Sequence, residues 1–133
     1  SSFQMAAAKL GAPLMNDFCS ISLSDLLTPW PQIENRIKSA AKGDFVLAIF
    51  NPKSIKRDWQ LKKAVDLLLE FRKPSTPVAI ARQIGRPEEN IEIYTLESLP
   101  FEQVDMLSIL VIGNSQSLVK NNKFLTPRGY FNN

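Results

Sequence analysis

The sequence predicts an α/β domain in which a mixed β-sheet is flanked by helices. Three uninterrupted apolar runs, at 45–50, 78–81 and 107–112, are typical of strands buried on both faces. Two segments, 31–42 and 55–72, carry apolar residues at helical spacing. Because strands and helices alternate early and short strands dominate the end of the chain, we expect a mixed sheet with helices on both faces.

The first predicted elements are two helices and the strand between them. An Ala-rich segment at 3–10 predicts a short helix that Gly11 ends. Residues 18–21 predict a strand. Pro31 at the first helical position opens the second helix, which Lys42 and Gly43 end. Its expected core face comprises Ile33, Ile37, Ala40 and Ala41.

The most strongly patterned part of the chain follows. The apolar run 45–50 predicts a buried strand, which Asn51 and Pro52 end. A longer helix is predicted over 55–72, since apolar and charged residues take opposite sides there. Its expected core face comprises Leu61, Ala64, Val65, Leu68 and Phe71.

The second half of the chain is predicted to contain mostly short strands. Glu92 interrupts an otherwise apolar segment and predicts a half-exposed strand. Asn121 and Asn122 are a hairpin turn signal. The predicted elements are strands at 78–81, 91–96 and 107–112, a short helix within 97–104 that has Pro100 near its start, and a hairpin of strands 117–119 and 123–125.

Composition excludes several classes of chemistry. The 133 residues predict one domain, 1–133, and include no histidine, which excludes Ser-His-Asp and Cys-His catalysis and His-ligated zinc within the chain. We predict no metal site. Cys19 is the single cysteine and is expected to be a small buried hydrophobe in a reducing, cytoplasmic protein. No apolar run is long enough to span a membrane, and the first residues lack the basic start of a signal peptide.

The charge of the chain favours a small anionic ligand. The net charge is +3 and the basic residues are spread along the sequence rather than clustered, which disfavours nucleic acid. Three loops follow predicted buried strands, at 51–54, 82–86 and 113–115, and would line one site if their strands are parallel. Their basic residues fit an anion, although Asn, Pro, Gly and Lys also occur in ordinary strand-to-helix connections.

Other polar and aromatic residues leave alternatives open. Arg128 stands between Pro127 and Gly129, where it either presents its fork to a carboxylate or belongs to an ordinary strand exit. Asp25 and Asp105 are candidates for capping groups or for general acid/base roles. The tryptophans, Trp30 and Trp59, are expected in the core or in a cleft wall.

Several stretches together resemble the precorrin-3B (carbon-17) methyltransferases of cobalamin biosynthesis, which are class III tetrapyrrole methylases. The matching stretches run in the family's order and cover nearly the whole chain. They are 11–14 (GAPL), 20–30 (SISLSDLLTPW), 51–54 (NPKS), 104–107 (VDML), 113–115 (GNS) and 126–130 (TPRGY).

The resemblance implies the C-terminal half of a two-domain enzyme that holds S-adenosylmethionine and a tetrapyrrole in the cleft between its domains. The family's glycine-rich N-terminal domain is not in this sequence, and Ser1-Ser2 resembles the end of the turn that opens the C-terminal half. Phe50 stands where the family more often has tyrosine, Ile84 where it has a small residue, and Asn16 where it often has histidine. The cofactor-binding residues implied in this way are Ser1, Ser2, Phe50, Asn51, Ile84 and Ser108.

The implied reaction is methyl transfer to carbon 17 of precorrin-3B, or of its cobalt form, with contraction of the macrocycle. The substrate carries several carboxylates, and Lys56 and Arg57 are further candidates to bind them. No residue is assigned as the catalytic acid or base. The implied substrate-binding residues are Lys53, Arg82, Arg86 and Arg128, and the family implies a homodimer.

Three other functions remain open at this point. One is methylation of a different precorrin carbon. Another is a non-catalytic binding or assembly module, because an isolated half lacks most of the cofactor site. RNA binding is the third, and it would show a steep dependence on salt.

Overall fold

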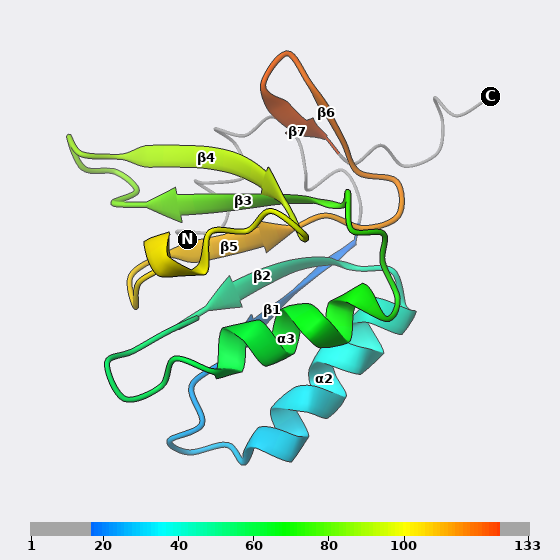
Figure 1. Ribbon diagram of the computed structural model, residues 1–133, viewed down its shortest axis with the longest axis vertical. Coiled ribbons are helices and arrows are strands. Elements are labelled where there is room, and N and C mark those ends of the chain that lie inside the picture. The colour runs from blue at the N-terminus through cyan, green and yellow to red at the C-terminus, as the bar shows by residue number, and fades with distance from the viewer. Residues whose placement is uncertain (1–16, 126–133) are drawn as a thin grey trace.

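The computed structural model describes residues 17–125 and confirms the α/β class. A five-stranded sheet has the strand order β1-β2-β5-β3-β4, and a separate hairpin pairs β6 with β7 (Figure 1). The predicted helix at 3–10 lies outside the described residues. The elements are β1 (Phe18–Ser22), α2 (Trp30–Lys42), β2 (Val46–Phe50), α3 (Gln60–Leu69), β3 (Pro77–Arg82), β4 (Asn90–Thr95), the 3₁₀ turn η2 (Phe101–Gln103), β5 (Ile109–Ile112), β6 (Leu118–Lys120) and β7 (Lys123–Leu125).

The sheet is mixed because β5 runs against both of its neighbours. β1 is parallel to β2, whereas β5 is antiparallel to β2 and to β3. β4 closes the sheet as an antiparallel edge strand beside β3. Leu110 of β5 lies opposite Ile49 on one side and Ile80 on the other, so β2 and β3 point the same way.

The two faces of the sheet are covered differently. Both described helices, α2 and α3, lie on one face, and the β6–β7 hairpin lies on the other (Figure 1). Successive residues of β2 therefore alternate between two cores: Leu47 and Ile49 join the helices, while Val46 and Ala48 join Phe124 of the hairpin. The expected helices on both faces are thus seen on one face within residues 17–125, where β-structure takes the second layer.

Helix α2 ends at Lys42, as predicted, but the left-handed residue that follows it is Asp44 rather than Gly43. Asp44 has φ 59°, whereas Gly43 stays right-handed. The amide of Asp44 donates to the carbonyl of Ala41, and that of Phe45 to the carbonyl of Ala40, both at 3.1 Å. This is the paired hydrogen-bond pattern of a Schellman motif. At the other end of α2, Pro31 is the second rather than the first helical residue.

Helix α3 is shorter than the predicted 55–72. Ser54 and Arg57 exchange backbone hydrogen bonds of 2.8 and 3.1 Å and close a tight turn, so the helix begins only at Gln60. Ile55 belongs to that turn and is 99% exposed. The hairpin prediction is confirmed: Asn121 and Asn122 have φ values of 53° and 61°, as a type I′ turn requires.

Gly113 ends β5 where the hairpin crosses the sheet. A Cβ atom at this position would lie 2.6 Å from Ser117 Cβ and 3.0 Å from the ring of Phe124. We therefore expect Gly113→Ala to lower the free energy of unfolding by about 1–2 kcal/mol, because the packed hairpin must shift. Urea unfolding would measure this, with Ser75→Ala as an exposed control expected to change stability by less than about 0.5 kcal/mol. Equal stability of the two variants would contradict the close approach.

Candidate functional site

Two of the three predicted loops meet at one edge of the sheet. Because β2 and β3 point the same way, their carboxyl ends lie at the same edge, with the start of β5 between them. Extending the observed register places Asn51, Ser108 and Arg82 side by side on neighbouring strands. Asn51 and Ser108, which the sequence interpretation assigns to one site, are thus neighbours, and Ile84 follows two residues after the end of β3.

The third predicted loop, 113–115, lies at the opposite edge. The expectation that it shares the site is wrong, because β5 is antiparallel to β2 and β3. The loop has structural partners there. Asn114 Nδ2 donates to the carbonyl of Asp44 at 3.0 Å, and the backbone and side chain of Ser115 both donate to the Asp44 carboxylate. Gly113 accepts a 2.6 Å hydrogen bond from Nη1 of buried Arg72.

The strand ends at the candidate site hold unusual backbone conformations. Asn51 has φ 49° and Gln83 has φ 54°, both in the left-handed region that residues other than glycine seldom adopt. Asn51 is fixed on both sides: its Nδ2 donates to Ser22 Oγ at 2.9 Å, and its carbonyl accepts a 2.7 Å bond from Arg57. Such conformations persist only where the surrounding structure holds them in place, and they cluster at functional sites.

Between these two strand ends lies a turn organised by Asp105. Ser108 is buried, and its hydroxyl donates to Asp105 Oδ1 at 3.0 Å and accepts from the Asp105 amide at 3.1 Å. The same carboxylate oxygen accepts the Leu107 amide at 2.9 Å. Of the two roles left open for Asp105, the structure supports capping.

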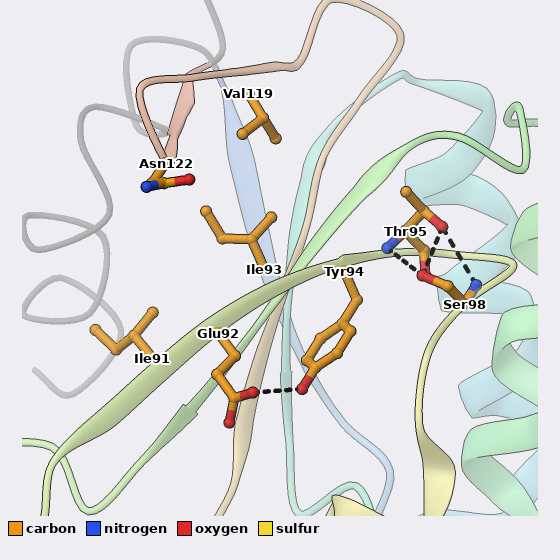
Figure 2. Close-up of a pocket in the computed structure, with 8 residues that line it drawn as sticks. All are labelled: Ile91, Glu92, Ile93, Tyr94, Thr95, Ser98, Val119 and Asn122. Atoms are coloured by element: carbon orange, nitrogen blue, oxygen red, sulfur yellow. Dashed lines mark hydrogen bonds between the residues drawn. The ribbon is translucent and has the colours of Figure 1, made fainter.

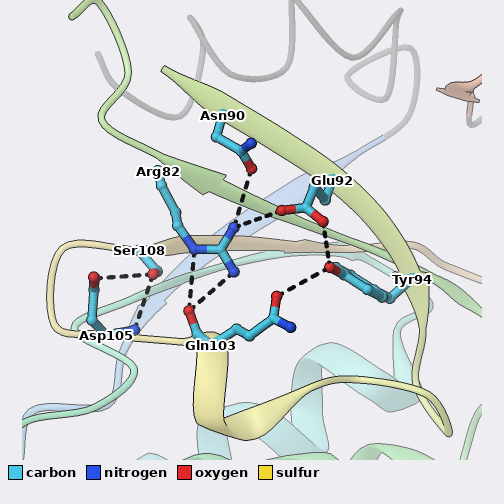
Figure 3. A network of polar contacts seen from close by, with 7 residues as sticks. All are labelled: Arg82, Asn90, Glu92, Tyr94, Gln103, Asp105 and Ser108. Atoms are coloured by element: carbon cyan, nitrogen blue, oxygen red, sulfur yellow. Dashed lines mark hydrogen bonds and ion pairs between the residues drawn. The ribbon is translucent and has the colours of Figure 1, made fainter. Parts of the chain in front are cut away.

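Arg82 is the centre of a polar network at the β3–β4 end of the edge (Figure 3). Its Nε and Nη2 both donate to the carbonyl of Gln103, at 3.1 and 3.0 Å. Its Nη1 donates to Asn90 and Glu92. The Tyr94 hydroxyl donates to Glu92 at 2.6 Å, and this bond raises the pKa of Tyr94 and lowers the pKa of Glu92. Arg82 lowers the pKa of Glu92 further and opposes the rise at Tyr94.

The predicted substrate-binding cations therefore differ in their surroundings. Lys53 donates to the carbonyl of Phe101 at 3.1 Å, so it joins Arg82 in holding the segment around η2. Arg86 is exposed, and its guanidinium has no partner among residues 17–125. The remaining predicted site residues, Ser1, Ser2 and Arg128, lie outside the described part of the chain.

A hollow of about 680 Å³ adjoins this edge at the β2 end. The loops after β1 and β2, the start of α3 and the turn before β5 line it. At one side Trp30 and Trp59 meet edge to face, with ring centroids 5.1 Å apart. The lining residues are Ser24, Asp25, Leu26, Asn51, Ser54, Ile55, Lys56, Arg57, Trp59, Gln60 and Met106.

Sequence reasoning named Asp25 and Arg57 as candidates but missed Gln60, which joins them at the polar centre of this hollow. Gln60 Nε2 donates to Asp25 Oδ2 at 3.1 Å across 35 residues of sequence, and Arg57 Nε lies 3.9 Å from Asp25 Oδ1. Gln60 is 2% exposed. No local pattern marks a glutamine as buried, and only the pairing of the two loops in space reveals it.

A second hollow of similar volume lies between β4 and the hairpin (Figure 2). Ile91, Ile93 and Val119 give it apolar walls. Its charged side chain, Glu92, is already bound by Tyr94 and Arg82. Among the described residues that line this hollow there is no lysine or arginine for an anionic ligand, so the strand-end edge is the better candidate site.

The sequence matches a known protein family. The family model of tetrapyrrole (corrin/porphyrin) methylases matches residues 1–100. The chain belongs to this family.

The relatives of the chain include C(17)-methyltransferases and cobalamin biosynthesis proteins. The chain is 49% identical over 125 residues to a probable cobalt-factor III C(17)-methyltransferase of Salmonella typhimurium, covering 94% of the chain and 52% of the relative. It is 40% identical over 129 residues to a precorrin-3B C(17)-methyltransferase of Sinorhizobium sp, covering 93% and 51%. The crystal structure of the methyltransferase CobJ superposes with a TM-score of 0.89 at 36% identity, covering 94% of this chain and 52% of that one.

Two further facts concern this methylase chain. It spans about half the length of both of these relatives and of the CobJ structure. Within residues 17–125, neither helix is long and apolar enough to cross a membrane.

Proposed function

We propose that this chain forms one wall of the active-site cleft of an S-adenosylmethionine-dependent methyltransferase that methylates carbon 17 of precorrin-3B or of its cobalt form. The observation that carries the proposal is the meeting of Asn51, Ser108 and the end of β3 at one sheet edge. The names of the two relatives support the position of methylation. The accompanying ring contraction is part of the proposal and rests on the family resemblance.

The residues at the edge fit S-adenosylmethionine. Phe50, at the end of β2, and Ile84, just beyond the end of β3, are half-buried apolar side chains, and an adenosine needs such a wall. The left-handed residues Asn51 and Gln83 turn the backbone sharply just beyond the strand ends, so the backbone is accessible to a ligand. The cofactor supplies an already activated methyl group. The protein therefore needs mainly to align two ligands and exclude water, which requires no histidine.

The opposite wall would come from a second domain. We propose that the half of the relatives that this chain does not span supplies the glycine-rich part of the cofactor site. The isolated chain would then bind ligand without activity, which is also what the alternative of a non-catalytic module predicts. The homodimer remains a prediction drawn from the family, and the cytoplasmic location remains one drawn from the single cysteine.

The first test is calorimetry with S-adenosylhomocysteine, the product of the cofactor. The full-length protein that contains this chain is expected to bind it with micromolar affinity, whereas residues 1–133 alone are expected to bind at least about tenfold more weakly, because half of the contacts are absent. Methyl transfer from a ¹³C-labelled cofactor, followed by NMR of the product, identifies the methylated carbon. Transfer to another carbon would replace the proposed position, and no binding by the full-length protein would overturn the proposal.

A further inference from the structure

The hollow beside Asn51 has its own arrangement of charge, which rests on three loops brought together by the fold. Arg57 is its most rigid cation, since its side chain is only 11% exposed. Nη1 donates to the carbonyls of Leu23 at 3.2 Å and Asn51 at 2.7 Å. Nη2 has no hydrogen-bond partner within residues 17–125, so a pre-positioned donor remains for a ligand.

Other groups add positive potential to the same hollow. Lys56 is exposed and has no side-chain partner in the described part of the chain. Helix α3 begins here, with neither a side-chain cap nor an acidic residue in its first turn. Its free amides therefore favour an anion. Asp25 is the one acidic residue in the lining, and Gln60 and Arg57 hold it.

Gln60 gives an independent indication of a ligand. Its amide orientation is fixed because Nε2 donates to Asp25. Its Oε1 is buried and has no hydrogen-bond donor in the described structure. A buried acceptor without a partner is costly, and because Gln60 lines the hollow, a ligand N–H or O–H group that reached this oxygen would supply the missing donor.

The rim of the hollow is apolar and almost fully open to solvent. Leu26 is 88% exposed, Ile55 99% and Met106 57%, and they come from three different loops. A small inorganic anion would leave these side chains in water. An amphipathic ring system with acidic side chains and ring N–H groups would cover them while placing a carboxylate on the cations.

We propose that this hollow binds a carboxylate side chain of the tetrapyrrole, held between Arg57 and Lys56, with the edge of the macrocycle on the rim of Leu26, Ile55 and Met106. The inference rests on the proposed function and assigns the substrate's place within it. Asn51 belongs both to the hollow and to the proposed cofactor edge, so the macrocycle lies next to the methyl donor, as transfer requires. Of the cations that the sequence suggested for the substrate carboxylates, Arg57 and Lys56 are thus favoured over Lys53 and Arg82, whose nitrogens donate to backbone carbonyls.

The test uses the full-length protein with Lys56→Gln and Arg57→Lys. Each variant is expected to raise the dissociation constant of the tetrapyrrole substrate about tenfold, the loss of one charge-assisted hydrogen bond. The dissociation constant of S-adenosylhomocysteine is expected to change less than about twofold in Lys56→Gln, whereas Arg57→Lys also disrupts the bond to the Asn51 carbonyl and is expected to weaken cofactor binding as well. Lys62→Gln is the matched control, because Lys62 lies on α3 outside the hollow and pairs with Asp66 at 3.4 Å. It is expected to bind both ligands normally.

A methyl-esterified tetrapyrrole separates charge recognition from general damage. Wild type is expected to bind the ester weakly, and Lys56→Gln is expected to cause no further loss, since the carboxylate is already neutral. Normal substrate binding by Lys56→Gln, or an equal loss for the ester and the acid, would overturn this assignment. An active wild type with unaffected variants refutes only the hollow, whereas an inactive wild type refutes the proposed function itself.

Discussion

Replacing Arg72 with methionine is expected to lower the free energy of unfolding by about 3 kcal/mol, the largest stability change we predict for this chain. Arg72 is 7% exposed and lies just after α3. Its Nη1 donates to Gly113 at 2.6 Å, and its Nη2 donates to the carbonyl of Phe45. One side chain thus joins the end of β5 to the segment that follows α2.

The size of the effect follows from what methionine leaves behind. Two carbonyls lose their donor, at a cost of about 1–3 kcal/mol each when buried. Part of this is offset, because Nε of Arg72 is itself buried without a partner and the guanidinium must be kept charged in the interior. Burial lowers the pKa of Arg72, while the nearby Asp44 acts in the opposite direction.

Urea unfolding of residues 1–133 measures the change, with Lys73→Met as the control. Lys73 is the next residue and is exposed, so its replacement is expected to change stability by less than about 0.5 kcal/mol. A loss below about 1 kcal/mol for Arg72→Met would show that water replaces the arginine at both carbonyls, and that the contact is not structural.

The fold was largely predictable because its signals are local. The turn at Asn121-Asn122 and the apolar run that became β2 depend on neighbouring residues alone, and both are where the sequence predicted them. The predicted start of α3 was wrong because local signals were the only guide there too. Residues 55–59 contain no helix breaker, and the Ser54–Arg57 hydrogen bonds that displace the helix leave no mark in the pattern.

The site was only partly predictable because it depends on strand direction. Loops 51–54, 82–86 and 113–115 each follow an apolar run in the sequence. Because β5 is antiparallel to β2 and β3, the last of these loops lies at the opposite edge. Partners distant in sequence decide the role of each cation in the same way. Arg82 looked free, but Gln103, which lies 21 residues away, binds it.

Asn51 combines a left-handed backbone with a place in the proposed cofactor site, so the second large effect, on cofactor affinity, is expected there. In the full-length protein, Asn51→Val is expected to weaken S-adenosylhomocysteine binding about 30-fold. A β-branched residue is strained at φ 49° by about 1–3 kcal/mol, and relief of that strain moves the strand end. The movement also withdraws the carbonyl that accepts from Arg57 at 2.7 Å.

Asn51→Gly is the matched variant, because glycine adopts this conformation without strain. It loses the bond from Nδ2 to Ser22 but keeps the backbone, so we expect cofactor affinity within about threefold of wild type. Calorimetry on both variants then separates backbone from side chain. Equal weakening by valine and glycine would mean that the amide group itself carries the effect. Wild-type affinity in both would mean that the end of β2 is not part of the cofactor site. The proposed substrate hollow would then no longer lie next to the methyl donor.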